Sequence, residues 1–153
     1  MSGAFCNHLK GNIDGEKEAV LATLEEYAAA YCAKDIDRLM ALFDDGDGIS
    51  LIGTGSDELC AGPEETKAVF VRNFAEATAT KFEWHWTDVI VSGESAVVAT
   101  TLTIYLDVED GSFEVPIRWT VSMARKDGKW KWLHRHASAA ADSQGEGTAY
   151  PID

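Results

Sequence analysis

The chain has 153 residues, of which 46% are hydrophobic and 10% aromatic, the composition of a single globular domain with a buried core. Its formal net charge of −13 repels phosphate groups, so we expect neither nucleic-acid binding nor attachment to an anionic membrane. Because the chain has three cysteines without a CxxC pair, no signal-peptide pattern and no apolar run near the ~18 residues of a membrane span, we expect a cytoplasmic protein without a disulfide framework.

The first predicted helix follows a polar, aperiodic segment. Residues 1–13 are expected to form an N-terminal tail, and Asp14 can cap a helix that starts near Glu16. One face of this helix carries large apolar side chains at helical spacing: Val20, Leu24, Tyr27 and Tyr31.

Two shorter helices are predicted next. Asp35 can cap the second helix, and the residues of its buried side are Ile36, Leu39, Met40 and Phe43. A short strand is expected at 49–52, followed by a loop that reaches Gly62. Pro63 suits the first position of a third helix, whose inner face would consist of Thr66, Val69, Phe70, Asn73 and Phe74.

From Lys81 onward the hydrophobic period is that of a strand. Long strands are expected at 81–91, 95–108, 112–126 and 129–138, and the intervening turns contain Gly93, Gly111 and Gly128. Strands of this length must twist and curve around the helices. Helices followed by antiparallel strands predict an α+β fold, with one domain at 14–140 and a loose C-terminal tail at 141–153.

Three segments carry a resemblance to a known family: EEYAAAYCAKDIDRLMALF, GESAVVATTLTIYLD and DGKWKWLHRHAS. In their order and spacing the chain resembles the NTF2-like superfamily. Within that superfamily it is most similar to the SnoaL-like group, which includes the association domain of calcium/calmodulin-dependent protein kinase. The resemblance implies an NTF2-like cone, in which three N-terminal helices pack on a strongly curved, mainly antiparallel sheet. It also implies a homodimer or a higher homo-oligomer.

Two classes of function stay open. The first is a small-molecule-binding domain with a pocket between the helices and the curved sheet, which could act as a lyase-, isomerase- or hydrolase-like enzyme. The second is a non-catalytic oligomerisation module similar to the kinase association domain. No cofactor is expected in either case.

The pocket chemistry differs from that of the association domain, where arginines on several strands bind carboxylates. Aligned on the DGKW turn, two of those positions fall on Val121 and Ala137. Arg135 shares the alternation class of Ala137, so it could reach the same cavity, where an acidic side chain or an anionic ligand such as a carboxylate would neutralise it. We expect Trp119 to face the cavity rather than Arg118. A β-bulge would exchange the two faces of a strand.

Tyr27 and Tyr31 lie on the helix that borders the pocket in this superfamily, and a buried hydroxyl needs a wall group, a water or a ligand as its partner. Both are expected to bind ligand. Tyr27 precedes Asp35 by eight residues, the spacing of the oxyanion-hole tyrosine in ketosteroid isomerases of the superfamily. Their aspartate base would fall near 50–52 and their second oxyanion donor near Ser122, where this chain has no carboxylate. Ketosteroid isomerase activity is therefore not expected.

His134, His136 and Ser138 alternate on the last strand, so their side chains point to one face. Two histidines at this spacing can supply two zinc ligands, with His85 or one of the acidic residues as a third. Nothing in the sequence positions that third ligand, so no metal site is predicted. We expect instead a hydrogen-bonded row at a sheet surface or a dimer contact.

Overall fold

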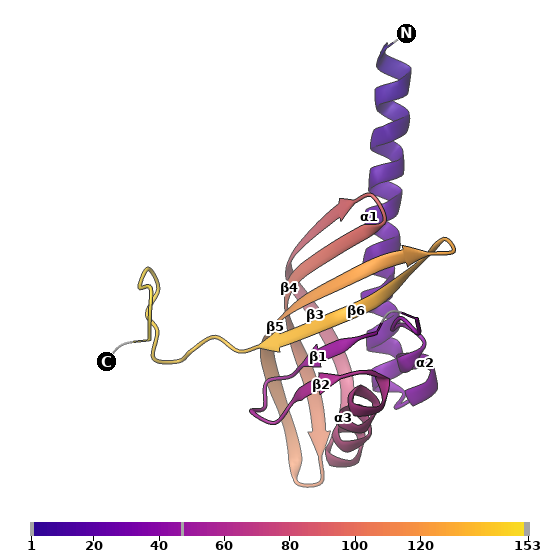
Figure 1. Cartoon of the computed structure of the whole chain (residues 1–153). Coiled ribbons are helices and arrows are strands. Elements are labelled where there is room, and N and C mark those ends of the chain that lie inside the picture. The colour runs from indigo at the N-terminus through magenta and orange to yellow at the C-terminus, as the bar shows by residue number, and fades with distance from the viewer. Residues whose placement is uncertain (1, 47, 152–153) are drawn as a thin grey trace.

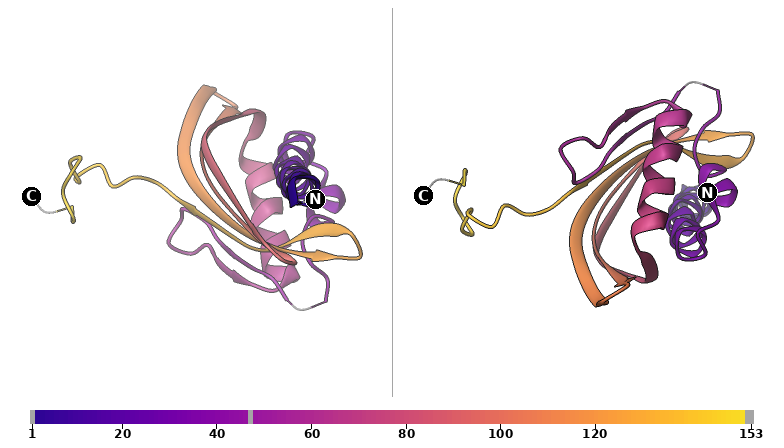
Figure 2. Two further views of the ribbon diagram at one scale, coloured as in Figure 1. Left: turned by 90° about the horizontal axis from the view of Figure 1, so that it is seen from above. Right: turned by 90° about the horizontal axis from the view of Figure 1, so that it is seen from below.

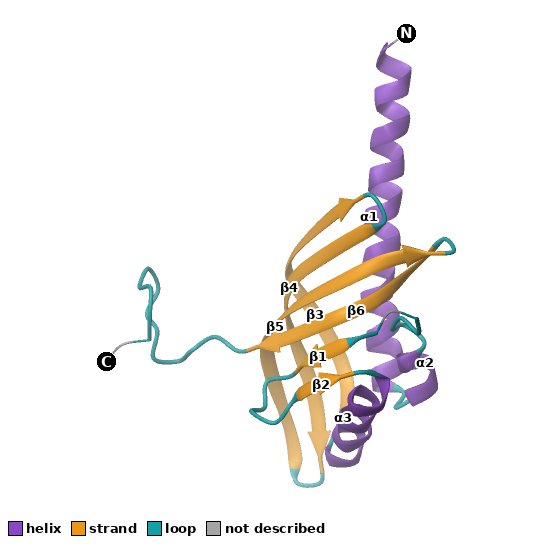
Figure 3. Cartoon of the chain, in the orientation of Figure 1, coloured by secondary structure: helices purple, strands orange, loops and turns teal. Residues whose placement is uncertain are grey.

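The computed structural model describes residues 2–46 and 48–151, with side chains from Asp14 onward. Three helices lie against one six-stranded sheet in this part of the chain (Figures 1 and 3). The elements, in chain order, are α1 (Ser2–Cys32), α2 (Ile36–Met40), β1 (Ser50–Ile52), β2 (Leu59–Ala61), α3 (Pro63–Glu76), β3 (Thr78–Ser92), β4 (Ser95–Val108), β5 (Gly111–Lys126) and β6 (Lys129–Ser138).

The strands form one sheet in the order β2-β1-β6-β5-β4-β3. All neighbours run antiparallel except β1 and β6, which are parallel. The sheet is strongly curved, and α1 and α3 lie on its concave side (Figure 2). This arrangement confirms the predicted α+β class and the NTF2-like cone of helices on a mainly antiparallel sheet.

Helix α1 is longer than predicted. It begins at Ser2 rather than near Glu16, so residues 2–13 of the segment expected to be a tail are helical and extend beyond the sheet (Figure 1), and Met1 lies outside the described residues. Because its glycines have low helix propensity, this extension was not predicted from the sequence. A helix that is already nucleated by packing, however, adds each further residue at little free-energy cost. The predicted apolar face is confirmed: Val20, Leu24 and Tyr27 are buried, and Tyr31 is partly buried.

The two short helices form as the sequence predicts. The Asp35 side chain caps α2 by accepting a hydrogen bond from the Arg38 backbone N–H at 3.1 Å. Pro63 occupies the first turn of α3, and Thr66 and Phe70 are the residues of that helix with no exposed surface. Together α1, α2 and α3 close one side of the curved sheet.

The long strands match the predicted hairpins, and one short strand was missed. Asp127 and Gly128 both have positive φ, the signature of a tight type I′ hairpin turn between β5 and β6. Strand β2 lies in the segment predicted as a loop, because its only partner is β1. Strand β3 begins at Thr78, slightly before the predicted Lys81.

A β-bulge in β6 decides which side chains face the helices. Ser122 pairs with His134, whereas the next residue of β5, Met123, pairs with Trp132, so Leu133 is the extra residue. Because of this bulge, Trp132 and Arg135 lie on the same side of β6 although they are three residues apart. Arg135 therefore lies on the concave face of the sheet, and its neighbours His134 and His136 point to the opposite face.

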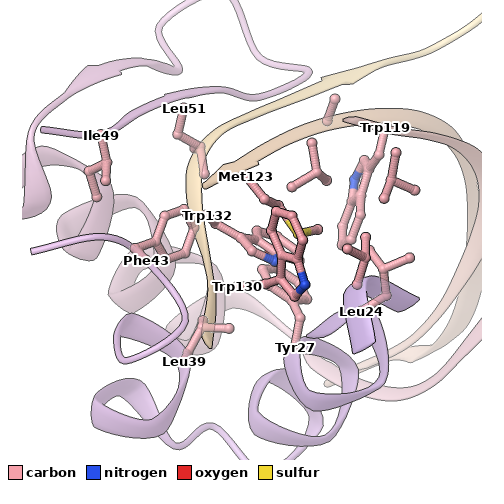
Figure 4. Close-up of a cluster of buried hydrophobic side chains, with 14 of the residues drawn as sticks. Leu24, Tyr27, Leu39, Phe43, Ile49, Leu51, Trp119, Met123, Trp130 and Trp132 are labelled. Carbon is pink, nitrogen blue, oxygen red and sulfur yellow. The ribbon is translucent and has the colours of Figure 1, made fainter. Parts of the chain in front are cut away.

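Aromatic side chains dominate the core between α1 and the sheet (Figure 4). Tyr27 stacks on Trp132 with ring centroids 5.0 Å apart and meets the edge of Trp119 at 4.8 Å. Burial of such rings contributes much of the stability of a domain of this size. No helix in residues 2–46 or 48–151 is both long enough and apolar enough to span a bilayer.

Candidate functional site

A cavity of about 110 Å³ lies between the end of α1, the turn that joins β1 to β2, and the concave face of the sheet. Its lining residues are Tyr31, Gly53, Thr54, Glu58, Ile104, Leu106, Val115, Ile117, Arg135 and Ala137. The wall combines apolar side chains of the sheet with polar groups in about equal measure. Its charged groups are the guanidinium of Arg135 and the carboxylate of Glu58.

Arg135 is the buried cation of the cavity. Its residue surface is 7% exposed, and its Nη1 donates a hydrogen bond of 3.3 Å to the Tyr27 hydroxyl. The guanidinium carbon lies 5.2 Å from the centre of the Trp119 ring, within range of a cation–π contact. Among the described residues, Arg135 forms no ion pair, and its Nε has no hydrogen-bond partner.

Tyr27 and Trp119 contact Arg135 from the core side, and they do not line the cavity themselves. Burial raises the pKa of the Tyr27 hydroxyl, and the positive charge of Arg135 acts in the opposite direction. Tyr27 is therefore a neutral phenol that accepts from Arg135. Alternation on β5 places Trp119 on the concave face, and Arg118 is exposed on the other, where it donates to the Ser138 hydroxyl at 3.3 Å.

Tyr31 forms part of the cavity wall one helical turn after Tyr27. Its ring stacks on that of Tyr27 with centroids 5.6 Å apart. Burial raises the pKa of the Tyr31 hydroxyl, and a hydrogen bond with the Asn73 side chain and the charge of Arg135 oppose that rise. Glu58 acts in the same direction as burial, so the Tyr31 hydroxyl lies within the electrostatic reach of both charged groups of the cavity.

Glu58 is a cavity residue that sequence reasoning missed. It ends the turn between β1 and β2, and its Oε1 accepts a 2.8 Å hydrogen bond from the Gly55 backbone N–H. A Cβ atom added at Gly53 would lie 2.5 Å from Glu58 Oε2, and one added at Gly55 would lie 2.5 Å from Oε1. At Gly53 the added atom would also lie 2.8 Å from the Glu58 Cβ, so this position requires glycine, whereas at Gly55 a shift of the carboxylate end would make room. The available sequence signal was the pattern of two glycines shortly before an acidic residue in GTGSDE, between two short apolar runs.

The positions suggested by the family resemblance hold no charged side chain on the concave face. Val121 and Ala137, which take the places of arginines in the association domain, are both buried. In β1 the buried residue is Leu51, whereas the Ser50 hydroxyl bonds to His134 Nδ1 at 2.7 Å. Arg135 is thus the sole cation lining this cavity among the described residues.

The residues His134, His136 and Ser138 lie on the face of β6 opposite to Arg135. The centroids of the His134 and His136 rings are 6.3 Å apart. Burial lowers the pKa of His134. His85 is on β3, which β5 and β4 separate from β6 in the sheet order. Within the described ranges no group of three or more His, Cys, Asp or Glu side chains is arranged to hold a metal ion.

Two of the larger hollows are less suited to specific binding. One of about 470 Å³ lies between α1 and β3, beside Trp84 and two glutamates. The other, of about 500 Å³, lies on the outer face of the sheet below residues 139–142. Neither is lined by the buried polar atoms without partners that the described chain contains, Arg135 Nε and Trp119 Nε1. The smaller cavity beside Arg135 is therefore the best candidate site.

Solved structures with the same fold come from several bacteria. An NTF2-like family protein from Streptomyces avermitilis, provisionally assigned as a dehydratase, matches with a TM-score of 0.76 and 20% identity over 84% of this chain and 98% of its own. A provisionally assigned calcium/calmodulin-dependent protein kinase II association domain from Xanthomonas campestris matches with a TM-score of 0.70 and 24% identity over 80% of this chain and 86% of its own. A ketosteroid isomerase-like protein from Erwinia carotovora atroseptica matches with a TM-score of 0.68 and 18% identity over 80% of this chain and 95% of its own.

At these identities the likeness shows a shared fold. No curated protein matches the sequence. The family model of the SnoaL-like domain matches residues 20–142, which include every residue of the cavity wall. The chain therefore belongs to the SnoaL-like domain family, within the NTF2-like fold.

Proposed function

We propose that this protein binds a compact organic carboxylate in the cavity, with Arg135 as the anion-binding residue. The observation that carries the proposal is a buried guanidinium that has no ion pair within the described chain and an Nε without a partner. Arginine is almost never fully buried unless it is paired. A ligand carboxylate at the terminal guanidinium nitrogens would supply the missing negative charge.

The surroundings of Arg135 favour binding in a fixed orientation. Tyr27 and Trp119 contact the guanidinium from behind, which leaves further N–H donors for a ligand. A guanidinium has five N–H donors in a planar fork that matches the two oxygens of a carboxylate. Tyr31 adds a phenol at the wall, so the predicted ligand-binding residues Tyr27, Tyr31, Trp119 and Arg135 all have a role in the proposal.

The size of the cavity limits the ligand. Its volume of about 110 Å³ suits a small molecule. Only a few heavy atoms fit inside, and a larger molecule would extend through the mouth. If the ligand is also converted, fold neighbours named as a dehydratase and as ketosteroid isomerase-like favour a lyase or isomerase reaction over hydrolysis.

Native mass spectrometry of the purified protein tests the proposal. We expect a small extra mass that is lost on denaturation and is absent from the Arg135→Met variant, which removes the charge and keeps an apolar stem. Arg118→Met is the matched control, because Arg118 lies on the opposite face of the neighbouring strand β5. Equal ligand loading of wild type, Arg135→Met and Arg118→Met would refute the proposal.

Incubation of the identified ligand with the protein then tests conversion. Loss of one water from the ligand would indicate a lyase. An unchanged mass with a changed NMR spectrum would indicate an isomerase.

The second candidate is a homo-oligomerisation module that assembles through the outer face of the sheet, where His134, His136 and Ser138 lie. The fold neighbour named as a kinase association domain favours it. In the same spectra, ligand-free particles larger than a dimer would support this function. A homodimer at micromolar concentration that carries ligand would exclude the larger assembly and favour the binding function.

A further inference from the structure

We infer that Glu58 forms an anionic half of the site opposite the cationic half formed by Arg135, and that the ligand is a small zwitterionic amino carboxylate. The inference rests on the proposed function, because Arg135 must bind the carboxylate end. Glu58 would then bind the ammonium end. The pairing of these two residues on one small cavity is the observation from which the ligand class follows.

The β1–β2 turn is built around the Glu58 carboxylate. The side chain is 16% exposed, and Gly53 and Gly55 leave no room for a Cβ atom beside its oxygens. Two backbone hydrogen bonds close the turn: Gly53 N–H donates to the Glu58 carbonyl at 2.9 Å, and Glu58 N–H donates to the Gly55 carbonyl at 3.1 Å. With the bond from Gly55 to Oε1, these contacts fix the carboxylate at the cavity wall.

The two charges of the cavity do not neutralise each other. In the described part of the chain, no Arg135 nitrogen lies within the 4.0 Å of an ion pair from Glu58. The nearest cation to Glu58 is Arg72, whose Nη2 is 3.9 Å from Oε2, but Arg72 bonds more closely to Asp57 at 2.9 Å. Arg72 is not part of the cavity wall, so the ligand-facing charges are one cation and one anion.

A zwitterion matches this pair of charges better than a simple carboxylate does. A monocarboxylate on Arg135 would bring a second anion close to Glu58 in a cavity only about 110 Å³ in volume. A simple amine on Glu58 would face Arg135. The overall charge of −13 also repels a free anion at long range, whereas a zwitterion carries no net charge. Because the cavity is small, the two charged ends must be separated by few bonds.

Binding of matched pairs of small molecules tests the inference. The pairs are glycine with acetate, 3-aminopropanoate with propanoate, and 4-aminobutanoate with butanoate, each titrated into the full-length protein by NMR. We expect the amino compound to bind about tenfold more tightly than its partner for at least one chain length, since a charge-assisted hydrogen bond is gained. Glu58→Gln should abolish this preference while keeping the acceptor for the Gly55 N–H.

Glu65→Gln is the matched control, because Glu65 also accepts a backbone hydrogen bond, from Ala61 at 2.8 Å, but lies outside the cavity wall. It should retain the preference. Arg135→Met should weaken both members of each pair. If plain carboxylates bind as tightly as amino carboxylates and depend on Arg135, the zwitterion inference is wrong and the proposed function stands. If none of the six compounds binds, the inference is also wrong, and the native mass spectra decide the proposed function separately.

Discussion

Arg135 is a buried side chain whose charge no carboxylate within the described chain neutralises. A buried unpaired charge lowers the stability of the ligand-free protein, because desolvation is not offset by Coulomb attraction. We therefore expect Arg135→Met to leave the free energy of unfolding within about 1 kcal/mol of wild type, or to raise it. Urea denaturation without added ligand measures the effect.

Arg125 provides the comparison for this prediction. It bonds to Glu16 at 2.6 Å and to Glu94 at 2.6 and 2.9 Å, so Arg125→Met should lower the free energy of unfolding. A loss of more than about 3 kcal/mol in Arg135→Met would show that Arg135 has a structural role in place of a ligand-binding one.

His134 should make stability depend on pH just below neutrality. Burial lowers its pKa in the folded state. An unfolded histidine binds a proton near pH ~6.5, whereas folded His134 does so only at lower pH. The stabilisation that comes from neutral His134 is therefore fully present above pH ~6.5 and is lost as the pH falls below it. We expect the melting temperature to fall between pH 7.5 and 5.5, and to fall less in His134→Gln. An equal fall in both proteins would contradict the prediction.

At the scale of single elements, the β1–β2 turn depends on glycine for close approach. A Cβ atom at Gly53 would lie 2.5 to 2.8 Å from the Glu58 side chain, so Gly53→Ala must displace that carboxylate. We expect a loss of about 1–2 kcal/mol in unfolding free energy and weaker ligand binding. Thermal denaturation and the NMR titrations measure the two effects.

Gly15 supplies the control, because it is in α1 and a Cβ atom there would meet nothing within 4 Å. Gly15→Ala should be neutral or raise stability by up to about 1 kcal/mol, since alanine is the better helix former. Equal effects of Gly15→Ala and Gly53→Ala would show that the turn does not hold Glu58 as described.

The elements also show what sequence reasoning can reach. Asp35, Pro63 and the Asp127-Gly128 turn act through local backbone chemistry, so the sequence alone predicted where their helices and hairpin form. Burial of Val20, Leu24 and Tyr27 followed from helical periodicity. The alternation rule likewise placed Trp119 on the concave face and Arg118 on the other.

The parts that were missed depend on contacts between distant segments. The bulge at Leu133 is defined by pairing with β5, and β2 exists because it pairs with β1. Glu58 enters the candidate site only because its turn folds back toward Arg135. None of these leaves a periodic signal in the local sequence.

At the scale of the whole molecule, repulsion among the excess acidic side chains should lower the stability of the folded state. The chain has 26 acidic and 13 basic residues, so the acidic residues outnumber the basic residues that could pair with them. Raising sodium chloride from 10 to 150 mM shortens the Debye length from about 30 to about 8 Å. We expect the melting temperature to rise by a few degrees, because screening reduces repulsion more than it weakens ion pairs such as Arg125–Glu94. A fall would show that the ion pairs dominate.

The extra residue in β6 also affects how relatives can be compared. Counted from the hairpin turn at Gly128, every side chain beyond Leu133 is shifted by one step relative to a regular strand. In a homologue without that residue, the side chain that faces the ligand is found one column away in an ungapped alignment. The placement of a single gap thus determines whether an arginine or a histidine is read as the pocket residue. Specificity within this family should therefore be assigned after superposition of the last strand.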